Sequence, residues 1–186
     1  MSTLLSKTVI SKHLMLALLL MPPLFSQSFN SLPDWARPHA VATAQESAPP
    51  EADAWVLLDR TEFAYTGQGE IVFQRFRLVR VLTENAFDEG SFVIQGLGGK
   101  ASKVKQLKGW NLRPDGDVER VNVDDATVLT TSEAVVTGAS LRRLVRGSLV
   151  AWQSQERFNS PMGPVGEVDV LERHPIRRWE LELAKQ

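Results

Sequence analysis

The sequence predicts an all-β protein, an antiparallel β-sandwich of about eight or nine short strands. Short segments rich in β-branched and aromatic residues recur across residues 54–184, and Gly, Pro and Asp residues separate them. No segment longer than about ten residues in this range shows an apolar period of 3.6, so helices are not expected there. The final candidate strand, 176–183, alternates cleanly, with Trp179, Leu181 and Leu183 on one face. A barrel is the alternative architecture.

Residues 1–28 predict a secretory signal peptide. Lys7 and Lys12 precede a short apolar run at 14–21, and Pro22 and Pro23 follow it. A membrane anchor is the competing interpretation, but the run is shorter than the roughly 20 residues that a spanning helix needs. Cleavage could follow the serine-containing stretch 26–28 or the Ala-Thr-Ala stretch 42–44. We therefore expect an exported protein, periplasmic or extracellular, without a stable membrane span after cleavage.

Residues 29–53 predict a lead-in with little core of its own. The segment is rich in Pro, Ala and Ser, a composition typical of linkers. Trp35 is the exception, because a tryptophan in a linker usually docks on another surface. The folded domain is expected to span residues 54–184.

The domain opens with a predicted β-hairpin over residues 54–83, folded around the turn 66–69 with its two glycines. Trp55 and Leu57 share a face with Phe63 and Tyr65, but apolar residues also occupy the other face. A strand of this kind lies between sheets or carries a β-bulge. Pro114, Asp115 and Gly116 predict a second hairpin turn. The further strand candidates are 91–94, 103–112, 117–123, 127–131, 140–146, 148–158, 165–171 and 176–183.

Composition excludes several classes of function. The chain of 186 residues has a formal net charge of −1, which gives no bulk electrostatic reason to expect nucleic-acid binding. It has no cysteine, which removes disulfides, thiolate zinc sites and cysteine nucleophiles. We predict no cofactor, no metal and no enzymatic activity.

Three features of the sequence are candidate chemical sites. The glycine-rich stretch 96–102 lacks the spacing of a phosphate-binding loop. His174 precedes a proline and has no nucleophile motif near it, which favours a structural or solvated histidine. The acidic cluster is expected to be a solvated rim, since it lacks EF-hand spacing; it comprises Asp115, Asp117, Asp124 and Asp125.

A surface for glycan or peptide is the alternative function that the residues suggest. Trp110 and Trp152 could present aromatic platforms on a sheet face, although tryptophans of a sandwich more often lie in its core. Arg142 and Arg143 could recognise an acidic partner or an anionic glycan. These four residues form the predicted interaction surface of a bacterial envelope module.

The order of motifs resembles a bacterial exported β-sandwich domain of unknown function that precedes transglutaminase-like domains. The resemblance is carried by residues 32–35, 54–59, 79–82 and 113–116, and by 146–150 and 174–178, so it covers about 32–183. Arg146 stands where the family often has proline. The resemblance implies a partner, a transglutaminase-like domain in cis or in trans. The Cys–His–Asp machinery of that domain has no counterpart here, so the resemblance favours a non-catalytic interaction or scaffolding module, either an accessory domain or a piece of a longer protein.

Overall fold

The protein folds as a β-sandwich, which confirms the predicted fold class. The computed structural model describes residues 29–66, 69–97, 102–131, 134–158 and 174–184. In these ranges a six-stranded sheet has the order β5-β4-β8-β2-β1-β9, and a three-stranded sheet has the order β3-β7-β6. The strands are β1 (Ala54–Tyr65), β2 (Ile71–Val81), β3 (Ser91–Leu97), β4 (Ser102–Leu112), β5 (Val118–Asn122), β6 (Thr127–Thr130), β7 (Ala134–Ser140), β8 (Leu149–Phe158) and β9 (Trp179–Ala184). The helices are α3 (Arg37–Ala42) and the 3-10 turns η1 (Glu84–Gly90) and η2 (Val123–Asp125).

The large sheet is antiparallel except at one edge, where β9 pairs with β1 in parallel. The predicted antiparallel pairing holds for the other pairs of this sheet but not for this one. Strand β8 also runs in the direction of β1, so β8 and β9 are parallel. Two parallel strands that follow each other in the sequence need a long crossover connection. Residues 159–178 provide that length between Phe158 and Trp179.

The opening hairpin pairs as predicted, and β1 carries a bulge, one of the two alternatives for its two-sided pattern. The register between β1 and β2 shifts between Val56 and Leu58, which marks a bulge. Each face of the strand is also covered, because the buried Val56 packs between the sheets while Leu57 and Leu58 pack on the outer face. Gly116, with a φ of 90°, closes the predicted turn between β4 and β5.

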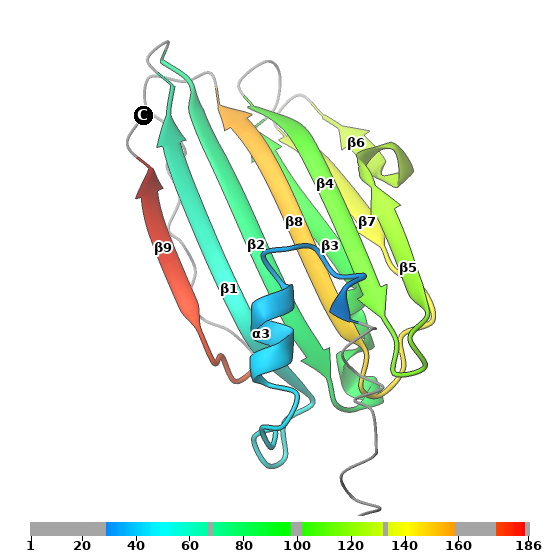
Figure 1. The fold of residues 1–186 in the computed structure, drawn as a ribbon. Coiled ribbons are helices and arrows are strands. Elements are labelled where there is room, and N and C mark those ends of the chain that lie inside the picture. The colour runs from blue at the N-terminus through cyan, green and yellow to red at the C-terminus, as the bar shows by residue number, and fades with distance from the viewer. Residues whose placement is uncertain (1–28, 67–68, 98–101, 132–133, 159–173, 185–186) are drawn as a thin grey trace, which may run out of the picture.

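Two apolar cores lie on opposite faces of the large sheet (Figure 1), where the small sheet is behind it and α3 crosses in front of β1. The inter-sheet core includes Val79, Leu107 and Trp152. The second core contains residues of the lead-in, which the sequence predicts to have little core of its own. Leu32 and Ala36 are buried in it against the sheet. The segment that reads as a linker therefore supplies a third layer. Trp35 docks as predicted, with its ring edge against Phe76 at a centroid distance of 5.4 Å.

Two strand predictions differ from the structure. Residues 140–146 were expected to be a strand, but β7 ends at Ser140 and an irregular segment follows. Leu141 and Leu144 are both buried in the inter-sheet core. A straight strand cannot place residues three apart on one face. The backbone of Arg143 is also left-handed, with a φ of 54°. Strand β7 was missed because Gly138 and the small residues around it weaken its strand signal.

Several predictions fall on residues outside the described ranges. They are the signal peptide over 1–28, the strand over 165–171 and most of the glycine-rich loop. Within the described residues, no helix has the length and apolar character needed to cross a membrane.

Candidate functional site

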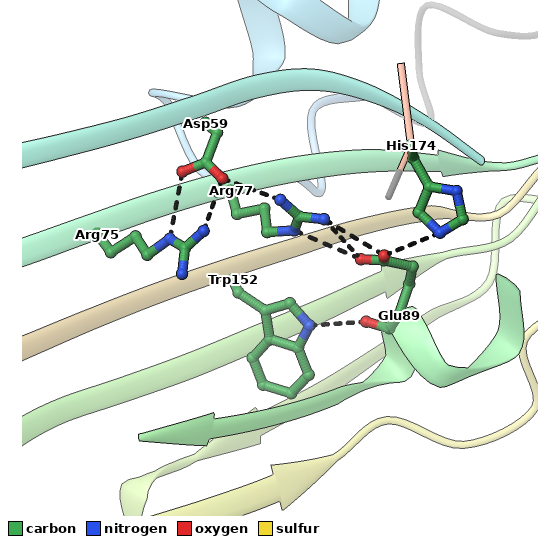
Figure 2. Close-up of polar contacts among 6 residues, drawn as sticks. All are labelled: Asp59, Arg75, Arg77, Glu89, Trp152 and His174. Atoms are coloured by element: carbon green, nitrogen blue, oxygen red, sulfur yellow. Dashed lines mark hydrogen bonds and ion pairs between the residues drawn. The ribbon is translucent and has the colours of Figure 1, made fainter. Parts of the chain in front are cut away.

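A network of charged side chains lies on the side of the large sheet that faces the small sheet. Alternation along β2 places Arg75 and Arg77 on this face, and register pairs Arg77 with Asp59 of β1. Glu89 comes from η1, which links β2 to β3, and His174 comes from the segment before β9. Figure 2 shows the five side chains in a row, with the indole of Trp152 alongside.

The two arginines hold Asp59 from two sides. Arg75 donates from Nε and Nη2 to the two carboxylate oxygens of Asp59, at 3.2 and 2.7 Å. Arg77 donates from Nη1 to Oδ2 of the same carboxylate at 2.9 Å. A bidentate guanidinium pair fixes geometry as well as charge, so Asp59 is firmly oriented.

Arg77 also reaches Glu89, which connects the network to His174. Its Nη2 donates to Glu89 Oε2 at 3.2 Å, and Glu89 Oε1 lies 3.4 Å from His174 Nε2. The indole Nε1 of Trp152 donates to the backbone carbonyl of Glu89 at 3.0 Å and so fixes η1 against the core. Two guanidinium groups and two carboxylates balance, so the network is neutral when the imidazole is neutral (Figure 2).

His174 forms part of the wall of a pocket of about 350 Å³. The pocket lies where β1 begins and η1 begins, and its lining is Pro50, Glu51, Ala52, Asp53, Asn85, His174 and Pro175. Asp53 is held in place because Oδ1 accepts from Asn85 Nδ2 at 3.2 Å and from the Thr83 hydroxyl. Glu51 has a φ of 61°, a left-handed conformation that is uncommon for a residue with a Cβ.

The pocket suits binding better than covalent chemistry. A histidine with a carboxylate behind it has the orientation of a general base. However, the lining residues include no serine, threonine, cysteine or lysine that such a base could activate. No group of three or more His, Asp or Glu side chains in the described part of the chain could hold a metal ion. The sequence favours a structural or solvated histidine at 174. His174 is buried beside Glu89, as a structural histidine would be, but it also lines the pocket.

A second feature is an apolar strip at the edge of the large sheet, formed by Tyr65, Trp179, Leu181 and Leu183. The parallel register puts the three β9 residues on the same face as Asp59, Thr61 and Phe63 of β1. The prediction that the β9 residues share a face is thus confirmed. Their exposed fractions are 40%, 46% and 79%, and that of Tyr65 is 59%. A strip of this kind on an edge strand is typical of an interaction surface.

The four residues of the predicted interaction surface do not form one. Trp152 is 1% exposed and lies in the inter-sheet core, so it offers no platform. Trp110 lies one register position away on the opposite face of the sheet, half-buried against the second core. Arg142 and Arg143 are exposed in the segment after β7, where the Arg142 amide donates to Glu119 Oε2 at 2.9 Å.

Three of the four acidic residues predicted to form a rim make local contacts, namely Asp115, Asp117 and Asp125. Asp117 pairs with Arg113 across the hairpin turn, and Asp115 Oδ1 accepts from the Asp117 amide at 3.0 Å. Asp125 caps the η2 turn by accepting from the Asn122 amide at 2.8 Å. These contacts leave the acidic side chains at the ends of β4, β5 and η2.

Glu156 is a buried carboxyl outside the charged network. It lies on the inter-sheet face of β8, four residues beyond Trp152, and register places it beside Phe73 of β2. Burial raises the pKa of its carboxyl to about 7. Sequence patterns did not single out Glu156 or Glu89, since an isolated acid in a strand or turn usually indicates a solvent-facing position.

Comparisons with known proteins support the fold and leave the family open. No protein-family model matches the sequence, and no curated protein matches it either. A crystal structure of a "putative protease" from Parabacteroides distasonis superimposes with a TM-score of 0.51 at 9% identity over 57% of this chain and 23% of that one. The match therefore spans less than a quarter of that protein's length.

Two further solved structures are more distant. An M1 zinc metallopeptidase from Deinococcus radiodurans gives a TM-score of 0.29 at 12% identity, over 58% of this chain and 21% of that one. The fibre head of bovine atadenovirus type 4 gives 0.28 at 9% identity, over 51% of this chain and 81% of that one. Neither of these two structures reaches a TM-score of 0.5, and at 9% identity the Parabacteroides distasonis match bears on the β-sandwich fold alone.

Proposed function

We propose that this chain is a non-catalytic, exported β-sandwich domain that acts as an interaction or scaffolding module for a transglutaminase-like domain, in cis or in trans. The observation that carries the proposal is the apolar strip on β9 and the end of β1. Trp179, Leu181 and Leu183 are three large apolar side chains in register on one edge strand, and each is at least 40% exposed. Fully burying one such side chain contributes roughly 1.5–3 kcal/mol, so a partner that covers the strip gains substantial free energy.

The strip is suited to a protein partner. Its strand is an edge of the sheet, and among the described residues only β1 pairs with it. Its opposite face is polar, with Glu180 and Glu182 alternating with the apolar residues. A surface that is apolar on one side and polar on the other docks against a partner from one direction.

The choice of partner rests on the sequence. The motif order of residues 32–183 resembles the family that precedes transglutaminase-like domains. The absence of cysteine from this chain and the absence of a nucleophile from the pocket lining support a non-catalytic role.

The test is co-purification with an identified partner. The full chain is expressed in its own cell with an affinity tag, and transglutaminase-like proteins are identified in the eluate by mass spectrometry. The test variant carries Leu181→Lys and Leu183→Lys. The matched control carries Val93→Lys and Val128→Lys, which replace two apolar residues of the small sheet that are more than half exposed, at 65% and 55%.

We expect the wild-type chain and the control to retain a transglutaminase-like protein and the β9 variant to lose it. Equal recovery with both variants would show that the strip is not the interface. Repeated absence of any transglutaminase-like protein under gentle conditions would overturn the choice of partner.

A further inference from the structure

The pocket beside His174 presents hydrogen-bond acceptors from several directions. Oδ1 of Asp53 accepts hydrogen bonds from Thr83 and Asn85, and among the described residues no hydrogen bond or ion pair reaches its Oδ2. Glu51 is exposed at the rim and has no polar partner in the described part of the chain. The amide nitrogen of Asn85 donates a hydrogen bond to Asp53, and its amide oxygen remains an acceptor.

His174 contributes a further acceptor from a buried position. The residue is only 7% exposed, yet it lines the pocket. Its Nε2 lies 3.4 Å from the Glu89 carboxylate, close enough to orient the ring but without a hydrogen bond. The other ring nitrogen, Nδ1, lies on the side of the ring away from Glu89 (Figure 2), and no hydrogen bond joins it to another described residue. In the tautomer with the proton on Nε2, Nδ1 is an acceptor.

The pocket therefore combines two carboxylates with neutral acceptors, and Asp53 and His174 are fixed from behind. Such a lining is complementary to a group that carries positive charge and several N–H donors. A metal ion fits less well, because no three potential ligands of the described residues are gathered for one. Pro50 and Pro175 add apolar wall, which suits the carbon stem of an organic cation.

We propose that this pocket binds a guanidinium or primary ammonium group, supplied either by a small organic cation or by a basic side chain of a peptide. The proposal is independent of the apolar strip, because the pocket lies at the start of β1 and the strip at its far end. The left-handed backbone at Glu51 fits this role, since it sets the direction in which that carboxylate leaves the turn before β1.

The test is an NMR titration of the full chain with methylguanidinium, and with N-methylurea as the uncharged probe of similar shape. We expect methylguanidinium to shift the amide signals of residues 51–53, 85 and 174 in a saturable way, with a dissociation constant on the order of 1 mM. N-methylurea should leave these signals unchanged. Equal shifts with both probes would overturn the proposal, because they would show that charge plays no part.

Variants locate the site. Glu51→Gln combined with Asp53→Asn should weaken methylguanidinium binding at least tenfold, and Glu51→Gln alone, at an exposed side chain, should weaken it about threefold. The matched control is Glu84→Gln, which removes one charge beside Asn85 from a residue outside the pocket lining. It should stay within twofold of wild type. Equal weakening by Glu84→Gln would point to general surface charge and refute the site.

The source of the cation is separated by two further titrations. Agmatine represents a free organic cation, and a short peptide with one central arginine represents a basic side chain. Tighter binding of the peptide by tenfold or more identifies a peptide ligand, and equal or tighter binding of agmatine identifies a small cation. No saturable binding of either would refute the proposal.

Discussion

Replacing Arg77 with methionine tests whether the charged network acts as a unit. The Arg77 side chain is 9% exposed and lies between two carboxylates that are 6% and 11% exposed, those of Asp59 and Glu89. In the variant Asp59 keeps Arg75 at 2.7 Å, whereas Glu89 keeps only the imidazole of His174 at 3.4 Å. One buried carboxylate then lacks a permanent cation. Breaking a buried pair from one side costs about 3–5 kcal/mol, and we expect a loss of about 3 kcal/mol in the free energy of unfolding.

The double variant separates an unpaired charge from simple loss of packing. In Arg77→Met with Glu89→Met, both charges of that pair are gone, and Asp59 remains balanced by Arg75. Apolar replacement of both partners is close to neutral in many buried pairs. We therefore expect the double variant to be at least about 2 kcal/mol more stable than the sum of the two single losses predicts.

Equilibrium urea unfolding at constant pH measures these differences, since urea does not screen charge as guanidinium chloride does. Arg75→Met is the comparison for a more exposed arginine, with 36% of its side chain in solvent. It should cost no more than about 1 kcal/mol, because Asp59 keeps Arg77. Single losses that add to within about 0.5 kcal/mol in the double variant would refute the idea of a coupled network.

Two further predictions concern buried positions of the same sandwich. Because burial raises the pKa of Glu156 to about 7, the unfolded state releases this proton at lower pH than the folded state does. The free energy of unfolding should therefore fall as pH rises from about 4.5 to above 7, by at most about 3 kcal/mol, and Glu156→Gln should remove that part of the slope in urea titrations at several pH values; an unchanged slope would contradict the assignment. A Cβ on Gly109 would lie 2.4 Å from Cζ3 of the buried Trp152, so Gly109→Ala should cost about 2–3 kcal/mol. Gly138→Ala, whose Cβ would meet nothing closer than 3.6 Å, should change stability by less than about 0.5 kcal/mol, and similar melting temperatures for both variants would refute the steric argument.

The parts of the fold that sequence predicted are those fixed by local chemistry. The hairpin of β1 and β2 and the turn at Gly116 depend on neighbours in sequence, and both form. The strand β9 alternates with period two, and its register places its apolar residues on one face as expected.

The parts that sequence missed depend on contacts between distant segments. The lead-in was read as a linker because Pro and Ala dominate it, but its few apolar residues, such as Leu32, are buried on a sheet that other residues build. Glu89 and His174 are separated by most of the folded chain, and no local pattern signals that they meet. The parallel position of β9 likewise follows from a crossover whose end point no local signal sets.

The difference in size between the two sheets explains why charge and apolar surface lie where they do. With neighbouring strands about 4.8 Å apart, three strands cannot cover the face of six. Among the described residues the small sheet packs mainly over β4 and β5, and the inter-sheet core reaches β1 and β2 only at their paired ends, near Val56 and Val79. The rest of the face formed by β2, β1 and β9 needs another solution. In the middle of that face, Asp59, Arg75 and Arg77 satisfy one another with paired charges.

At the edge of the same face the solution is different. Polar side chains on an edge strand protect it from pairing with other chains. The outer face of β9 is polar in this way, with Glu180 and Glu182. The inner face of β9 instead carries Trp179, Leu181 and Leu183, all exposed. On the neighbouring strands β1 and β2, paired charged side chains occupy the same face of the sheet. The sandwich therefore does not require apolar residues at these positions of β9. They are the residues that the proposed partner would cover.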